Sequence, residues 1–255
     1  MINTPLKSDR EWFRSWFNDQ YLQVYNHRDN AEAADFVAKW PIWDRISGEG
    51  WCLDLGCGSG RYISELTARN LKVIGLDLSL PLLQKAEVDG NPRIARRLIR
   101  ADFRHLPTVF RFDLIVSLFT SFGYFDDDEN QKFLKNVSDL LKSEGIYVLD
   151  LFNPDFVKSE VLKNPTSTKI KEGLKIIETR SINSLQNRVE KLIVINDGKY
   201  RNEYFESVRM YDMKELTNML SEVGIMPFTP VWGDYKGSVF NIKSPRMVYF
   251  GVKRD

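Results

Sequence analysis

The sequence is poor in the residues that build metal and redox sites. Its 255 residues include two cysteines and two histidines. Cys52 and Cys57 lie five positions apart and have no partner cluster, so their spacing indicates neither a disulfide framework nor a zinc site. We expect both cysteines to be ordinary strand or turn residues, and we expect no metal ion.

Signals for export, membrane insertion and nucleic-acid binding are missing as well. No apolar run reaches the roughly 18 residues of a membrane-spanning helix. Lys7, Asp9 and Arg10 lie where a signal peptide would have apolar residues. The 36 basic and 35 acidic residues give a net charge of +1, without the basic surplus of a dedicated nucleic-acid binder. These absences predict a cytoplasmic protein with no membrane partner and make nucleic acid an unlikely partner.

The most informative stretch that is present is residues 51–60, an apolar strand that ends in Gly56, Gly58 and Gly60. Glycine takes backbone conformations closed to other residues and lets the chain come within contact distance of a ligand. A helix over 61–69 and a second strand over 71–76 are expected next, and this strand ends in Asp77. A carboxylate there can accept hydrogen bonds from both hydroxyls of a ribose, so the unit predicts a nucleotide-type binding turn.

The glycine spacing bears on which nucleotide is bound. Dinucleotide-binding turns follow G-x-G-x-x-G and receive a pyrophosphate, whereas here the third glycine arrives one residue early. Asp54 also lies inside the strand, two residues before Gly56. A carboxylate suits a ligand with an ammonium group better than a pyrophosphate.

At this point the chain resembles the class I S-adenosylmethionine-dependent methyltransferases, whose first motif is similar to Leu53-Asp54-Leu55-Gly56-Cys57-Gly58-Ser59-Gly60. Three further landmarks follow in order. They are Ala101-Asp102-Phe103 after an expected strand at 95–100, the segment 117–124 after a strand at 112–116, and Lys142-Ser143-Glu144-Gly145 between a helix near 128–141 and a strand at 146–152. The resemblance covers 51–153 and returns at 209–252.

The resemblance implies an α/β fold, with a Rossmann-like seven-stranded sheet and flanking helices, and it implies S-adenosyl-L-methionine as cofactor. In such a protein Asp102 would face the adenine amino group and the segment 117–124 would face the methyl donor. The cofactor-binding residues implied in this sequence are Tyr21, Asp54, Gly56, Cys57, Gly58, Gly60, Arg61, Asp77, Leu78, Asp102, Phe103 and Leu118.

Three regions are expected along the chain. Residues 1–46 form a helical arm, because aromatic residues recur there at three- and four-residue steps; Tyr21 and Tyr25 are candidates for a lid. Residues 47–153 and 209–255 form the catalytic domain, with a helix at 213–223 and strands at 225–231 and 245–252. Residues 154–208 form an antiparallel β cap with strands at 175–182, 188–195 and 200–208, and Asn196-Asp197-Gly198 predicts a hairpin turn. Similar methyltransferases for glycine-like and amino-sugar substrates have a small sheet there.

Methyl transfer from a sulfonium is an in-line displacement, so it needs alignment of the reacting groups and exclusion of water rather than a nucleophilic side chain. A proton acceptor is needed for a hydroxyl or ammonium nucleophile. Two segments are expected to meet above the donor, residues 120–124 and the loop 233–238. Tyr124 and Tyr235 are the candidate catalytic residues, and the weaker candidates are Asp234, Ser238 and His27.

Several classes of methyltransferase are disfavoured. Enzymes that act on base amines or on glutamine have an [N/D]-P-P-[Y/F] box after the fourth strand, where this chain has Ser117-Leu118-Phe119-Thr120, and there is no cysteine there for attack on a pyrimidine ring. The sequence predicts a small-molecule methyltransferase, a monomer or homodimer, that acts on an amine or a hydroxyl. The alternatives are a tRNA or protein methyltransferase, or a donor-binding protein without turnover.

Overall fold

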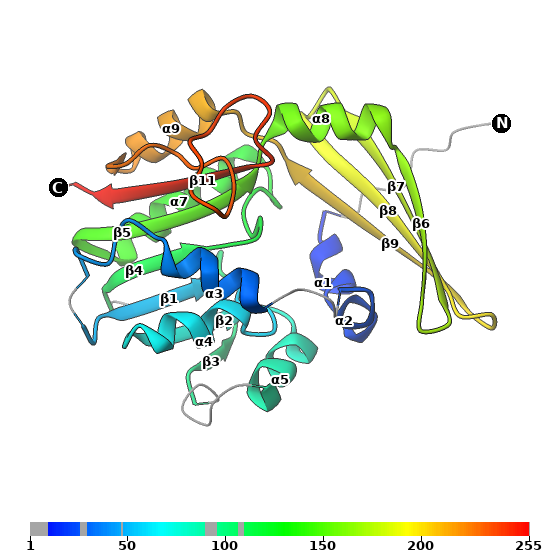
Figure 1. Ribbon diagram of the computed structural model, residues 1–255, viewed down its shortest axis with the longest axis horizontal. Helices are drawn as coiled ribbons and strands as arrows, with labels where there is room; N and C mark the ends of the chain where they lie inside the picture. The colour runs from blue at the N-terminus through cyan, green and yellow to red at the C-terminus, as the bar shows by residue number, and fades with distance from the viewer. Residues whose placement is uncertain (1–9, 26–29, 47, 90–95, 107–109, 255) are drawn as a thin grey trace.

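The computed structural model describes residues 10–25, 30–46, 48–89, 96–106 and 110–254. Figure 1 shows two sheets, a larger one covered by helices and a smaller one beside it, with the helices α1 and α2 between them. Within the described residues no helix is both long and apolar enough to cross a bilayer.

The larger sheet has seven strands in the order β10-β11-β5-β4-β1-β2-β3. The neighbouring strands β5, β4, β1, β2 and β3 are parallel to one another, and β11 runs antiparallel to both β5 and β10. This arrangement confirms the expected fold class. The strands are β1 (Trp51–Leu55), β2 (Lys72–Asp77), β3 (Leu98–Arg100), β4 (Phe112–Ser117), β5 (Leu141–Phe152), β10 (Ile225–Pro227) and β11 (Arg246–Lys253).

Helices pack on both faces of this sheet, because its strands alternate apolar side chains between two hydrophobic clusters. One cluster includes Phe36 and Ile63 from the helices α3 (Asn30–Ala38) and α4 (Arg61–Ala68). The other includes Phe133 and Leu216 from α7 (Asp127–Leu140) and α9 (Met213–Glu222). The helix α5 (Leu80–Asp89) follows β2.

The smaller sheet, which we call the cap, is antiparallel in the order β6-β7-β8-β9. Its strands are β6 (Thr166–Lys171), β7 (Leu174–Asn183), β8 (Arg188–Asn196) and β9 (Arg201–Arg209), and the helix α8 (Pro154–Lys163) precedes them. Three of the four strands and the turn at Gly198 were predicted, whereas β6 and α8 were not. The division of the chain at residues 46, 153 and 208 stays a prediction.

Several elements differ from expectation. The strand expected at 225–231 ends at Pro227, because Pro227 and Pro230 have no N–H to donate to the ladder. The arm is three short helices, α1 (Trp12–Trp16), α2 (Asp19–Tyr25) and α3, rather than one. The first break lies at Asn18, whose side-chain oxygen accepts hydrogen bonds from the backbone N–H groups at the start of α2.

The arm is also divided in what it covers. Trp12, Phe13 and Trp16 of α1 share a hydrophobic cluster with Ile193 and Val208 of the cap. The helix α3 instead packs against the seven-stranded sheet. The aromatic periodicity therefore marks a face that binds the cap, not one continuous face on the core.

Candidate functional site

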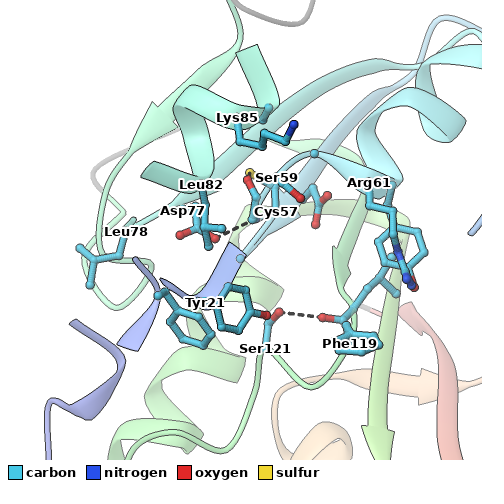
Figure 2. A pocket seen from close by; sticks show the side chains of 18 of the residues that line it. Tyr21, Cys57, Ser59, Arg61, Asp77, Leu78, Leu82, Lys85, Phe119 and Ser121 are labelled. Atoms are coloured by element: carbon cyan, nitrogen blue, oxygen red, sulfur yellow. Dashed lines mark hydrogen bonds between the residues drawn. The ribbon is translucent and has the colours of Figure 1, made fainter. Parts of the chain in front are cut away.

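A cavity of about 540 Å³ lies at the carboxyl ends of β1, β2 and β4, where ligands of open α/β sheets bind. Helices α1, α2, α4 and α5 complete its walls. In Figure 2, Tyr21 lies on one side of this cavity, and Arg61 and Phe119 lie on the other. All twelve residues implied as cofactor-binding by the sequence line it: Tyr21, Asp54, Gly56, Cys57, Gly58, Gly60, Arg61, Asp77, Leu78, Asp102, Phe103 and Leu118.

The glycine loop brings main chain directly to the cavity. Gly56, Gly58 and Gly60 have φ angles of 77°, 55° and 79°, a region that favours glycine. A Cβ atom on Gly56 would lie 2.7 Å from Ser121 Oγ, whereas on Gly58 it would meet only Leu82 Cδ1 at 4.0 Å. The space beside Gly58 is therefore cavity, and the loop leaves it open for a ligand.

Asp77 joins the end of β2 to this loop. Its Oδ2 accepts a hydrogen bond from the backbone N–H of Gly58 (2.8 Å), and its Oδ1 accepts one from Ser79 N–H (2.8 Å). Burial raises the pKa of Asp77 above its ordinary value, and these backbone hydrogen bonds oppose the rise. Each oxygen keeps a lone pair that a ligand hydroxyl could use.

Asp54, near the end of β1, is a buried carboxylate that lacks a hydrogen-bond partner for one of its oxygens among the described residues. Its side chain borders the cavity, and among the described residues its Oδ2 has no hydrogen-bond partner. Burial, and secondly the charge of Asp77, raises the pKa of Asp54 to about 7. A buried carboxylate without partners is costly, so the site suits a ligand that supplies a positive charge or N–H donors here.

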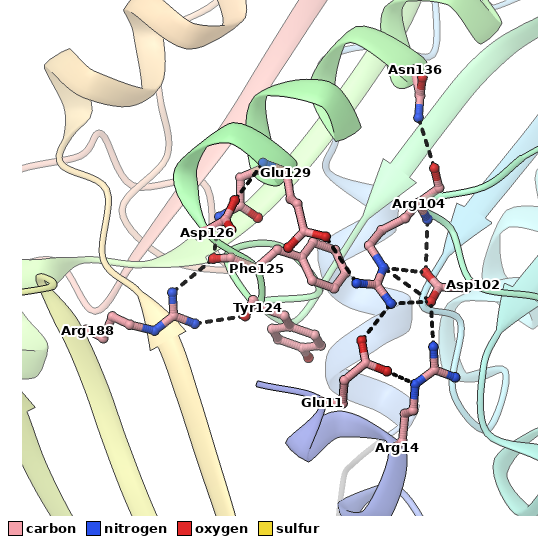
Figure 3. Close-up of polar contacts among 11 residues, drawn as sticks. Glu11, Arg14, Asp102, Arg104, Tyr124, Phe125, Asp126, Glu129, Asn136 and Arg188 are labelled. Atoms are coloured by element: carbon pink, nitrogen blue, oxygen red, sulfur yellow. Dashed lines mark hydrogen bonds and ion pairs between the residues drawn. The ribbon is translucent and has the colours of Figure 1, made fainter. Parts of the chain in front are cut away.

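Asp102 lies at another wall of the cavity, inside a network of charges (Figure 3). Arg104 Nη2 lies 2.7 Å and Arg14 Nη2 lies 3.2 Å from Asp102 Oδ2. Partial burial favours the protonated form, but the hydrogen bonds from Arg104 outweigh it and hold the pKa of Asp102 below its ordinary value. Arg104 also binds Glu11, which immediately precedes α1, so the network fixes this helix beside the cavity.

Tyr124 lines the cavity, as expected, and its position depends on both the arm and the cap. Its ring packs on Trp12 of α1, with the ring centroids 4.8 Å apart. The carbonyls of Gly123, Tyr124 and Phe125 accept hydrogen bonds from Arg188 of β8, at 3.2, 2.8 and 2.9 Å. Figure 3 shows this guanidinium reaching from the cap to the Tyr124 segment.

Tyr235, the second candidate catalytic residue, is not among the residues that line this cavity, and a contact with substrate stays a prediction. Its ring packs on Phe36 at 4.5 Å, and its hydroxyl donates a hydrogen bond to Asp150 Oδ2 (2.8 Å). Burial, and secondly the charge of Asp150, raises the pKa of Tyr235 well above its ordinary value, so the hydroxyl keeps its proton. In this contact the hydroxyl is the donor.

The weaker candidates Asp234 and Ser238 are also absent from the lining of this cavity. Ser238 Oγ donates to Asp234 Oδ2 (2.7 Å) within an exposed turn outside the cavity. Within the loop 233–238, Tyr235 contacts Asp150. His27 lies outside the described residues.

Some lining residues were missed by sequence reasoning. They come from the segment after β4 and from the helix after β2, and they include Phe119, Ser121, Leu82, Lys85 and Ala86. Phe119 and Ser121 lie in the segment 117–124, which was expected to face the donor, although neither was named as a site residue. The residues of α5 gave no such signal, because their place depends on how this helix packs beside the glycine loop.

Comparison with known proteins shows which family this chain is similar to. Residues 52–145 match a family described as a methyltransferase domain. The proposed methyltransferase YqeM of Bacillus subtilis is 25% identical over 246 residues, covering 91% of this chain and 96% of that protein.

Two solved structures show the same fold. An S-adenosylmethionine-dependent methyltransferase from Clostridium acetobutylicum has a TM-score of 0.78 at 22% identity, with 92% of this chain and 96% of that chain covered. The amino pentose methyltransferase CalS10 from Micromonospora echinaspora, solved with S-adenosylmethionine bound, has a TM-score of 0.65 at 20% identity, with 92% and 97% covered. These findings confirm the resemblance to class I methyltransferases, a family whose methyl donor is S-adenosylmethionine.

Proposed function

We propose that this chain, which has the domain and the fold of S-adenosylmethionine-dependent methyltransferases, transfers a methyl group from S-adenosylmethionine to an amine or a hydroxyl of a small molecule. One observation carries the proposal. A single cavity gathers all twelve residues that the sequence implies for the donor, and the unpartnered Asp54 Oδ2 is among the groups that border it.

The charges around the cavity suit the donor's different parts. Asp77 would accept hydrogen bonds from the ribose hydroxyls, and Asp102 would face the adenine amino group. Asp54 would compensate the positive charge of the methionine portion. Arg61, whose guanidinium lies 5.2 Å from the centre of the Phe119 ring, would pair with the carboxylate.

S-Adenosylmethionine supplies an activated methyl group, so the residues of the chain need only bind, align and exclude water. The arm and the chain that follows β4 would exclude water, since their rings form the walls: Phe17, Tyr21, Tyr25, Phe119 and Tyr124. Aromatic walls attract cationic groups. This lining favours an amine acceptor over a hydroxyl, because only an amine can enter as a cation; the ammonium group would then have to lose a proton before it attacks.

Labelled donor tests the proposal. We would incubate the protein with S-adenosylmethionine labelled in the methyl group and with cell extract separated into small-molecule, RNA and protein pools. Label transferred to the small-molecule pool would support the proposal. Label in RNA or protein would contradict it, and calorimetric binding of the donor without transfer to any pool would identify a donor-binding protein.

A further inference from the structure

The turn that follows β4 is strained where it meets the cavity. Phe119 and Thr120 are adjacent, and their φ angles of 56° and 64° place both in the left-handed region. Residues other than glycine rarely adopt this backbone conformation, and such strain persists only where surrounding contacts over-determine it. The Phe119 ring lines the cavity, so the strain lies at the site itself.

One buried residue holds both strained positions. Asp150 of β5 is 0% exposed. Its Oδ2 accepts a hydrogen bond from Phe119 N–H (2.8 Å), and its main-chain carbonyl accepts one from Thr120 N–H (3.0 Å). The two N–H groups of the strained residues are thus satisfied by the side chain and the backbone of a single residue.

Asp150 is held in turn from the last part of the chain. Arg246 of β11 donates to Asp150 Oδ1 from Nε (2.8 Å) and Nη2 (2.7 Å), and Nη2 also donates to Thr120 Oγ1 (3.0 Å). Tyr235 donates its hydroxyl to Asp150 Oδ2. The guanidinium balances the buried carboxylate, and together the donors fix its orientation.

We infer that Asp150, Tyr235 and Arg246 are positioning residues that hold the Phe119–Thr120 turn in its strained form and keep the Phe119 ring at the wall of the cavity. This inference rests on the proposed function. None of the three lines the cavity. Glycine at position 119 would relieve the strain, whereas this chain has a ring there that lines the cavity, which is what a residue used at the site requires.

Tyr235→Phe tests the inference with little risk to folding, because it keeps the ring packed on Phe36 and removes one hydrogen bond. Tyr249→Phe is the matched control, since Tyr249 of β11 is 1% exposed and its hydroxyl has no partner among the described residues. The readouts are donor affinity by calorimetry, kcat and KM for the labelled donor measured as transfer to the small-molecule pool of the cell extract, and hydrogen exchange of the 119 and 120 amides.

We expect Tyr235→Phe to lower kcat about tenfold and to speed exchange of the 119 and 120 amides about tenfold, which corresponds to one lost hydrogen bond to a charged group. Donor affinity should change by less than about twofold, and Tyr249→Phe should alter none of these readouts. Unchanged amide exchange in Tyr235→Phe would overturn the inference.

Phe119→Gly distinguishes a role of the Phe119 ring at the cavity from a role in the stability of the fold. It relieves the strain, so we expect the melting temperature to be kept or raised while kcat/KM falls about tenfold or more. A stabilised variant with full activity would overturn the inference. A wild-type protein that bound no donor would count against the proposed function alone, because the exchange and melting experiments need no turnover.

Discussion

Asp54 combines burial with a charge that the protein itself does not neutralise. Its pKa of about 7 lies above the ordinary 3.8, so the folded protein retains a proton that the unfolded chain releases between these two values. Stability contributed by this group is therefore lost as pH rises from about 4 to about 7. Binding of a cationic donor favours the ionised form and releases the proton.

We predict that donor binding is about tenfold weaker at pH 6 than at pH 8, because below a pKa of about 7 each pH unit reduces the ionised fraction about tenfold. Calorimetry in buffers of different ionisation enthalpy would measure the released proton. Asp54→Asn should bind the donor weakly at both pH values and should remove the dependence. Equal proton release by this variant would show that another group titrates.

Gly58 offers a matched test of the loop's approach to the ligand. Gly58→Ala and Gly173→Ala both place a Cβ in open space at a positive φ, but Gly173 lies in the hairpin between β6 and β7, far from the glycine loop. Both should lose about 1–2 kcal/mol of unfolding free energy. Only Gly58→Ala should weaken donor binding, by about tenfold or more, since its methyl group enters the cavity. Equal donor affinities by titration would exclude a close approach at Gly58.

At the scale of elements, Arg188 connects the cap to the segment of Tyr124. Besides the three carbonyls of residues 123–125, its guanidinium donates to Ser207 Oγ and to the Ser207 carbonyl (both 2.8 Å). Among the described residues no carboxylate lies within ion-pair distance of it. A lysine cannot donate to so many acceptors from one position.

Arg188→Lys should therefore lower the unfolding free energy by about 2 kcal/mol and reduce kcat, because the Tyr124 segment loses donors to its carbonyls. Arg201→Lys on β9 is the control, since that side chain is 63% exposed and pairs only with Glu203. Denaturant melts and turnover would measure both effects. Loss of stability with full turnover would assign Arg188 to the fold alone.

The helices α1 and α2 should respond to the donor, because Phe13 and Tyr21 from these helices, and Phe17 between them, belong to the cavity wall. Exchange of the backbone amides over residues 10–25 should slow when the donor is added, as covers over a site commonly become ordered on binding. The helix α9, which packs in the hydrophobic cluster on the other face of the seven-stranded sheet, serves as an internal reference that should not change. If the two regions responded alike, the protection would reflect general stabilisation of the protein.

At the scale of the whole molecule, the features that the sequence predicts well are those that depend on residues close together in the chain. The glycine loop and Asp77 follow from a strand, a turn and a strand, so the donor side of the cavity could be located from the sequence. The place of Tyr235 could not, because its partner Asp150 is 85 positions away and Arg246 reaches the same carboxylate across 96 positions. Such contacts depend on the antiparallel return of β11 beside β5, and no local pattern of residues encodes them.

The packing of the arm could not be predicted for the same reason, because it depends on residues far apart in the sequence. Periodicity located the aromatic residues, but it could not tell whether they pack on the seven-stranded sheet or on the cap. Trp16 shows the outcome, since its indole N–H donates to Glu206 of β9. That partner lies 190 positions away, so the sequence predicted the helix and not its neighbour.

The junction through Arg188 also has a consequence for how such a protein diversifies. Its contacts with residues 123–125 are made to main-chain carbonyls, which every amino acid carries. Substitutions at Tyr124 and Phe125 would therefore leave the hydrogen bonds to the cap in place. The lining of the cavity can thus be varied at these two positions while the connection between the two sheets is kept.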